Sequence, residues 1–234
     1  MKLTQFIMGM PVTVDVADTA VTADILDEVF NYFRYVDDKY SPFKPTSEVS
    51  QINAGKIKSP SPEMALILKL AEQTTKETNG YFDVWHDKKL DPSGLVKGWA
   101  INNAARILQN HGLKNYFVEA GGDIQTAGPK KWRIGIKNPF KPTEIVKIFT
   151  LSGQGIATSG NYERGLHIYN PKTGRAANDV ASITVIGPNV YEADRFATAA
   201  FAMGKNGLKF IATRPNLAGY QINKNGTAVL TANL

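Results

Sequence analysis

The stretch YFVEAGGDI, residues 116–124, stands where the character of the sequence changes. Its first half is rich in β-formers, and the pair Gly121-Gly122 permits the tight turn that ends a strand. Segments with helical periodicity come before this stretch, whereas short strand-like runs separated by turns come after it. Because helices gather early and strands late, the sequence predicts an α+β protein rather than a doubly wound α/β chain.

Helices are predicted where apolar residues recur at spacings of three and four. In residues 19–37, Ile25, Val29 and Phe33 form one such stripe, with Asp18 or Thr19 as the expected N-cap. Further helices are expected at residues 47–53, 63–78, 94–110 and 192–203, with another near Leu208.

Strands are predicted from alternation and from β-branched composition. Val12, Val14 and Val16 alternate with polar residues, and residues 8–11 (MGMP) interrupt this pattern, which predicts a bulge or a close approach to a ligand. Other strands are expected at residues 81–85, 116–119, 132–137, 145–151, 167–169, 182–186, 219–222 and 227–230.

Composition limits the classes of function. The 234-residue chain is 43% apolar and 21% charged, which is ordinary for a globular protein. It has no apolar run of about 18 residues that could span a membrane, and residues 1–6 do not resemble a signal peptide. Its lack of cysteine excludes disulfides, thiolate metal sites and a cysteine nucleophile. The net charge of +6 comes from scattered Lys and Arg residues, a pattern that argues against a nucleic-acid-binding protein.

Two segments carry groups suited to transfer chemistry. Asp194 and Thr198 lie four residues apart on one face of an expected helix, where a carboxylate and a hydroxyl could both bind Mg²⁺. Alternatively, Asp194 complements the helix dipole and Thr198 packs inward. His167 lies in a short apolar run, where it is either a base or structural. His86 and His111 are not spaced to form a zinc site with it.

Two glycine-containing segments are weaker candidates. Ser93-Gly94 at an expected helix start offers free amides to a phosphate, Lys97 could add positive charge and Trp99 could stack on a planar ring. Asp123 follows the Gly-Gly turn, and structural support is the alternative to a functional role. Neither a G-x-G-x-x-G dinucleotide fingerprint nor a P-loop is present.

Taken together, these segments resemble the FAD:protein FMN transferase family (the ApbE, or flavin transferase, family). The resemblance runs nearly end to end and in order. Its segments are residues 8–9 (MG), 47–53 (SEVSQIN), 80–83 (GYFD), 90–100 (LDPSGLVKGWA), 120–123 (AGGD), 157–160 (ATSG), 167–174 (HIYNPKTG) and 193–198 (ADRFAT). It implies a single α+β domain over residues 1–234, which could contain two intertwined subdomains, with mixed or antiparallel sheets and flanking helices.

The resemblance also implies an enzyme that cleaves FAD with the help of Mg²⁺. Such an enzyme attaches FMN through a phosphoester to a Thr or Ser hydroxyl of an acceptor protein and releases AMP. By position, His167 is the implied base. The implied Mg²⁺ ligands are the side chains of Asp194 and Thr198 and the backbone carbonyls of Val96 and Ala197. The implied flavin contacts are Met8, Phe43, Tyr81, Phe82, Asp83, Ser93 and Trp99.

Three departures from the family pattern qualify this expectation. Asn170 replaces the usual acid in H-I-x-D-P-x-T-G; it can form an Asx-turn but cannot stabilise an imidazolium by charge. Val96 replaces the small residue of G-I-A-K-G, which a backbone ligand tolerates. A leader and a lipobox are also missing, which predicts a cytoplasmic protein, or an exported one if a leader was removed. The alternatives are an FAD-binding or FAD-hydrolysing protein, and a basic binding module without catalysis.

Overall fold

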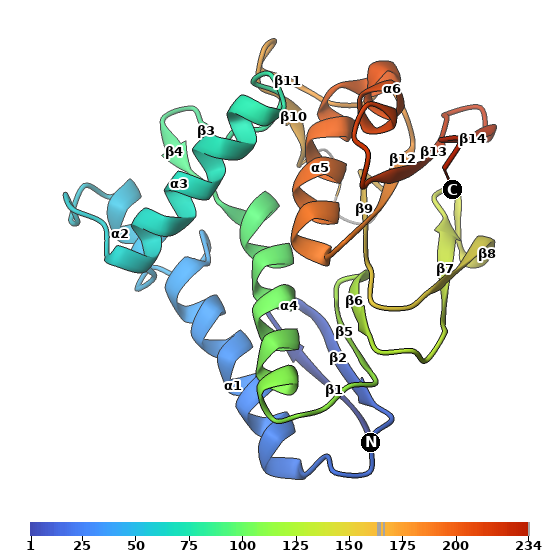
Figure 1. Ribbon diagram of the computed structural model, residues 1–234. Helices are drawn as coiled ribbons and strands as arrows, with labels where there is room; N and C mark the ends of the chain where they lie inside the picture. The colour runs from blue at the N-terminus through green and yellow to red at the C-terminus, as the bar shows by residue number, and fades with distance from the viewer. Residues whose placement is uncertain (163–164, 166, 234) are drawn as a thin grey trace.

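One antiparallel sheet runs through the computed structural model, which describes residues 1–162, 165 and 167–233 (Figure 1). Within these residues the sheet has eight strands in the order β1-β2-β5-β6-β9-β12-β13-β14. These strands are β1 (Lys2–Ile7), β2 (Met10–Val16), β5 (Tyr116–Ala120), β6 (Asp123–Ala127), β9 (Gly155–Gly160), β12 (Ser182–Gly187), β13 (Ala218–Ile222) and β14 (Ala228–Leu230).

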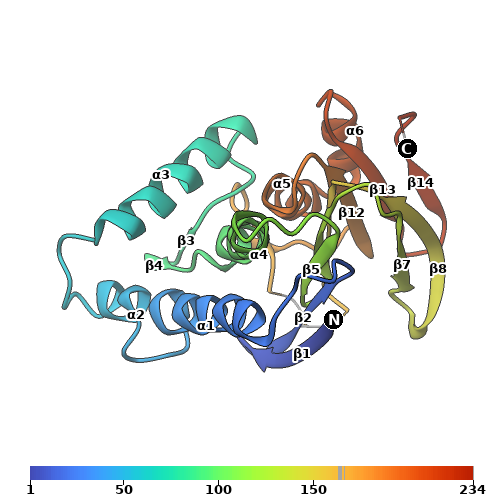
Figure 2. The same cartoon turned by 60° about the horizontal axis from the view of Figure 1, so that its bottom comes forward.

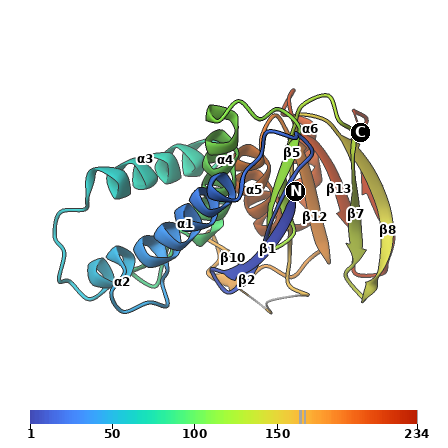
Figure 3. The ribbon, with the colours of Figure 1, turned by 90° about the horizontal axis from the view of Figure 1, so that it is seen from below.

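Helices cover one face of this sheet, and a β-hairpin covers part of the other (Figures 2 and 3). The helices are α1 (Ala23–Tyr40), α2 (Glu48–Asn53), α3 (Pro62–Glu77), α4 (Ser93–Asn110), α5 (Val190–Ala202) and α6 (Gly207–Ala212). The hairpin consists of β7 (Trp132–Asn138) and β8 (Lys141–Leu151). The predicted α+β class is therefore confirmed. In the described residues, no helix combines the length and apolar character needed to cross a membrane.

Alternation along the strands and stripes along the helices build the core between these layers. Val12, Val14 and Val16 are fully buried and face the helices. They meet the apolar stripe of α1, which includes Val29 and Phe33. The N-cap of α1 is Thr22 rather than the predicted Asp18 or Thr19, because the Thr22 hydroxyl accepts the Ile25 N–H.

The MGMP segment forms a hairpin turn, so the predicted bulge in one long strand is wrong. Met8 and Gly9 both have positive φ angles, 57° and 70°, and Ile7 pairs with Met10 across the turn. Two consecutive left-handed residues match the right-handed twist of the strands they join.

Two predicted strands are also displaced. Residues 81–84 are irregular, because the Asp83 carboxylate accepts the Trp85 N–H and turns the chain there. Only the two-residue strands β3 (Trp85–His86) and β4 (Lys89–Leu90) follow. Likewise, His167 precedes the short strand β10 (Tyr169–Asn170), which pairs with β11 (Arg175–Ala176).

Candidate functional site

Helices α4 and α5 approach each other closely beside the sheet. Together with the start of β6 they form a polar corner that consists of Lys97 from α4, Asp123 from β6, and Asp194 and Thr198 from α5. We call these four residues the α4–α5 corner. Gly98 permits the approach: a Cβ added there would lie 2.7 Å from the Asp194 Cβ. The Gly98 N–H donates to Asp194 Oδ2 at 2.8 Å, so the missing side chain brings the backbone amide to the carboxylate.

Gly98→Ala should therefore separate the two helices. The added methyl group overlaps the Asp194 side chain, and we expect a loss of about 1–3 kcal/mol in the free energy of unfolding. Urea denaturation measures this loss. Gly94→Ala on the same helix is the graded control, because its nearest contact, a Thr198 methyl carbon at 3.3 Å, is much less severe. Equal stability of the two variants would contradict the close approach at Gly98.

The corner buries two carboxylates with one lysine. Lys97 Nζ lies 2.6 Å from Asp123 Oδ2 and 3.6 Å from Asp194 Oδ1. Asp123 and Asp194 are 1% and 2% exposed. Burial raises the pKa of Asp194, and the neighbouring Asp123 raises it further, whereas Lys97 and the Gly98 amide oppose this change. The formal charge of the three side chains is −1, so the corner is suited to an additional cation.

Asp123 also fixes the sheet behind the corner. Its Oδ1 accepts the Thr158 N–H at 3.0 Å and thus ties the start of β6 to β9. The sequence predicted only weak roles for these two residues: Lys97 as extra positive charge near a phosphate, and Asp123 as a candidate with structural support as the alternative. The sequence contains both the AGGD and GLVKG segments, but the contact between Asp123 and Lys97 depends on the packing of α4 against β6.

Thr198 completes the corner from the next turn of α5. Its hydroxyl lies 3.4 Å from the Ser159 hydroxyl of β9. Val96 and Ala197, whose carbonyls are the other predicted ligands, are buried on the two facing helices. In the described part of the chain, no three His, Asp or Glu side chains converge as a complete metal site. The oxygen donors at the corner are the carboxylates of Asp123 and Asp194 and the hydroxyl of Thr198. Oxygen donors suit Mg²⁺, which keeps several water or phosphate ligands.

The predicted flavin segment 81–83 lies beside the start of α4. Phe82 is buried, and its ring would be 3.4 Å from a Cβ placed at Gly94. Asp83 is exposed, and Ser93 donates its N–H and hydroxyl to Asp91. The structure therefore brings Phe82 and Ser93 to the end of α4 that adjoins Thr198.

The β10–β11 hairpin packs over this segment. Tyr169 stacks on His86 with ring centroids 3.9 Å apart, and its hydroxyl donates to the Trp85 carbonyl at 3.0 Å. Lys172 Nζ lies 4.4 Å from the centroid of the Tyr81 ring. The Asn170 side chain accepts the Lys172 N–H at 2.9 Å, which confirms the predicted Asx-turn.

His167 is exposed just before this hairpin. Its Nδ1 lies 2.9 Å from the Gly165 carbonyl oxygen. A carbonyl oxygen can only accept, so Nδ1 carries the hydrogen and a neutral ring keeps its lone pair on Nε2. That tautomer is the one in which Nε2 can accept a proton.

The other three predicted contacts come from different parts of the fold. Trp99 packs against Tyr32 and Tyr40 of α1, with the closer centroid at 5.8 Å. Phe43 is 88% exposed on the loop after α1. Met8 is half-buried in the β1–β2 turn.

The fold and the corner define a class of protein: an α+β domain in which two helices bring an oxygen-rich, negatively charged site to the central strands β6 and β9 of an antiparallel sheet. The family model for the ApbE family matches residues 8–88 and 85–220, and the chain belongs to that family.

Among its relatives is the protein named FAD:protein FMN transferase from Escherichia coli strain K12. It is 31% identical over 159 residues, which cover 62% of this chain and 45% of the relative. The chain spans about half the length of the curated relatives it matches.

Solved structures of the same fold cover the whole chain. The crystal structure of the ApbE protein from Thermotoga maritima has a TM-score of 0.89 and 24% identity, covering 100% of this chain and 97% of that one. The flavin transferase ApbE from Vibrio cholerae has a TM-score of 0.83 and 24% identity, covering 99% of this chain and 97% of that one. The predicted ApbE-like fold is thus confirmed.

Proposed function

We propose that this protein is a Mg²⁺-dependent FAD:protein FMN transferase. The observation that carries the proposal is the α4–α5 corner, in which Asp194 and Thr198 project from one helix face beside Asp123. Membership of the ApbE family and relatives named FAD:protein FMN transferase support the same activity. The substrates are FAD and a protein that carries an acceptor Thr or Ser.

The proposed reaction is a phosphoryl substitution. The acceptor hydroxyl oxygen attacks the phosphorus on the FMN side of the pyrophosphate, and the bond from that phosphorus to the bridging oxygen breaks. FMN becomes linked to the acceptor by a phosphoester, AMP leaves with the bridging oxygen, and the hydroxyl proton passes to a base. Such reactions depend mainly on positioning and on neutralising charge.

The α4–α5 corner is itself negatively charged, so a cation held there would supply the charge neutralisation. Asp194 and Thr198, with the carbonyls of Val96 and Ala197, would hold Mg²⁺, which neutralises pyrophosphate charge and stabilises the leaving phosphate. Lys97 keeps both buried carboxylates in place through its contacts with Asp123 and Asp194. The start of α4 would turn the positive end of its helix dipole toward a bound phosphate.

His167 is the proposed base. Its Nδ1–H is engaged by the Gly165 carbonyl, which leaves Nε2 to accept the proton of the attacking hydroxyl. In this chain a backbone carbonyl orients the ring, whereas Asn170 shapes the following turn. Exposure of His167 gives a protein-borne hydroxyl access to it.

The proposal is tested by incubating the protein with FAD, MgCl₂ and a candidate acceptor domain that carries an exposed threonine. We expect AMP in the chromatogram and an acceptor whose intact mass has risen by one FMN group. Added EDTA should stop both products, and excess MgCl₂ should restore them. The same acceptor with its threonine replaced by alanine is the matched control.

Two other results would contradict the proposal. Release of free FMN and AMP without an adduct, with several acceptors, would indicate FAD hydrolysis with water as the acceptor. Steeply salt-dependent binding of nucleic acid without affinity for FAD would indicate a basic binding module.

A further inference from the structure

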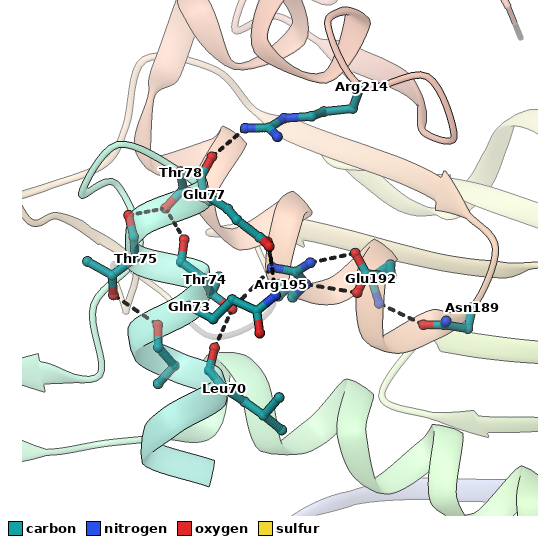
Figure 4. Close-up of polar contacts among 11 residues, drawn as sticks. Leu70, Gln73, Thr74, Thr75, Glu77, Thr78, Asn189, Glu192, Arg195 and Arg214 are labelled. Atoms are coloured by element: carbon teal, nitrogen blue, oxygen red, sulfur yellow. Dashed lines mark hydrogen bonds and ion pairs between the residues drawn. The ribbon is translucent and has the colours of Figure 1, made fainter. Parts of the chain in front are cut away.

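Arg195 lies next to Asp194 in sequence, and its side chain reaches Glu77 of α3 (Figure 4). It is 5% exposed. Its Nε and Nη2 donate to the two carboxylate oxygens of Glu192 at 3.2 and 2.6 Å. Its Nη1 donates to the Glu77 carboxylate and, at 3.3 Å, to the Thr74 hydroxyl. One guanidinium therefore joins the first turns of α5 to the last turn of α3.

The partners of Arg195 are themselves fixed. The Glu192 N–H donates to the Asn189 side chain, which caps α5. The Glu77 carboxylate also accepts from Gln73, and the Glu77 carbonyl accepts from Arg214 (Figure 4). Arg195, Arg214, Glu77 and Glu192 have no net formal charge together, so the buried guanidinium is compensated.

The end of α3 leads directly into the predicted flavin segment. After Glu77 the chain turns through Asn79 and Gly80, whose φ angles are 53° and 77°. The N–H groups of Gly80 and Tyr81 donate back to the last turn of α3 and its cap, at 2.8 and 3.1 Å. The position of Tyr81 therefore follows the position of the α3 end.

We propose that Arg195 is a positioning residue that fixes segment 78–83 relative to Asp194 and Thr198. The inference rests on the proposed function, in which FAD extends from segment 78–83 to the α4–α5 corner. Because Arg195 adjoins Asp194 on α5 and binds Glu77, the last residue of α3 before the segment, it sets the separation of the two halves of the FAD site.

Arginine is required for this role because its planar group binds three side chains at once. A lysine ammonium is a compact charge and cannot reproduce the paired contacts with Glu192 while it also reaches Glu77. Removal of the guanidinium should leave a folded protein, since the Glu77 and Glu192 side chains are 32% and 25% exposed and can reach water.

The test measures hydrogen exchange of the amides of residues 78–81 in the full chain, without FAD, in Arg195→Met and Arg195→Lys. We expect at least about tenfold faster exchange of these amides in Arg195→Met and an intermediate effect in Arg195→Lys. Val14→Ala, a core variant in β2, is the control for general loss of stability. It should leave these four amides as protected as in the wild type at a temperature where all variants are folded.

A second readout links the position of the segment to the reaction. In the FMN transfer assay, Arg195→Met should lower kcat by about 10–100-fold, because a misplacement near 1 Å has effects of this size. The proposal is overturned if exchange in residues 78–81 is the same in Arg195→Met and Val14→Ala, or if kcat is unchanged. If the wild-type protein transfers no FMN but the Arg195 variants show the expected faster exchange in residues 78–81, the proposed function is refuted. The positioning of the segment by Arg195 is then still supported.

Discussion

Asp194→Asn should abolish FMN transfer and leave the protein folded. The asparagine oxygen can still accept the Gly98 N–H, and the change removes one of two buried negative charges around Lys97. We therefore expect little loss of thermal stability. The proposed Mg²⁺ site, however, loses its charged ligand, so kcat should fall by at least about 10³-fold. Single-turnover AMP release measures the loss of transfer. Isothermal titration with MgCl₂ in the presence of FAD measures the loss of Mg²⁺ binding.

The matched control is Asp24→Asn, which removes an exposed carboxylate in the first turn of α1. It should transfer FMN at the wild-type rate. Transfer by Asp194→Asn within about tenfold of the wild-type rate would refute the metal assignment.

His167→Ala should still bind FAD but transfer FMN about 10²–10⁴-fold more slowly, the usual contribution of a general base. The imidazole is exposed, and its Nδ1 bonds to Gly165, so its removal disturbs no buried packing. Quenching of flavin fluorescence measures the affinity for FAD, and the appearance of the adduct measures the rate.

The control for this prediction is His111→Ala. His111 caps the C-terminal end of α4, and its ring pairs with Glu28 at the surface. Its rate should match that of the wild type. A His167→Ala variant as fast as His111→Ala would show that another group or water takes the proton.

The sequence predicted those elements of the fold whose periodicity is strong. The α1 stripe and the alternating Val12, Val14 and Val16 each place their apolar residues on a single face, and polar residues occupy the other face. Strands β6 and β9 were not predicted, since they lie in the middle of the sheet and are mostly buried along their length. Burial on both faces removes alternation, and the small or polar residues of DIQTA and GIATSG give no other strand signal.

The candidate site likewise has a part that the sequence predicted and a part that it did not. Asp194 and Thr198 are four residues apart, so helical geometry alone places them on one face. Asp123 joins them from a position 71 residues earlier in the chain, through the ion pair that Lys97 makes with both carboxylates. Nothing in the local pattern of AGGD predicts that contact.

The sequence by itself determined the α+β class, the main helices and the pairing of a carboxylate with a hydroxyl on α5, because each follows from local spacing. Tertiary structure alone decided which residues surround that pair. Gly98 lets α4 approach α5, Asp123 arrives from the sheet, and Arg195 reaches back to Glu77 on α3. These contacts join residues distant in sequence, and they depend on how helices and sheet pack rather than on any single periodicity.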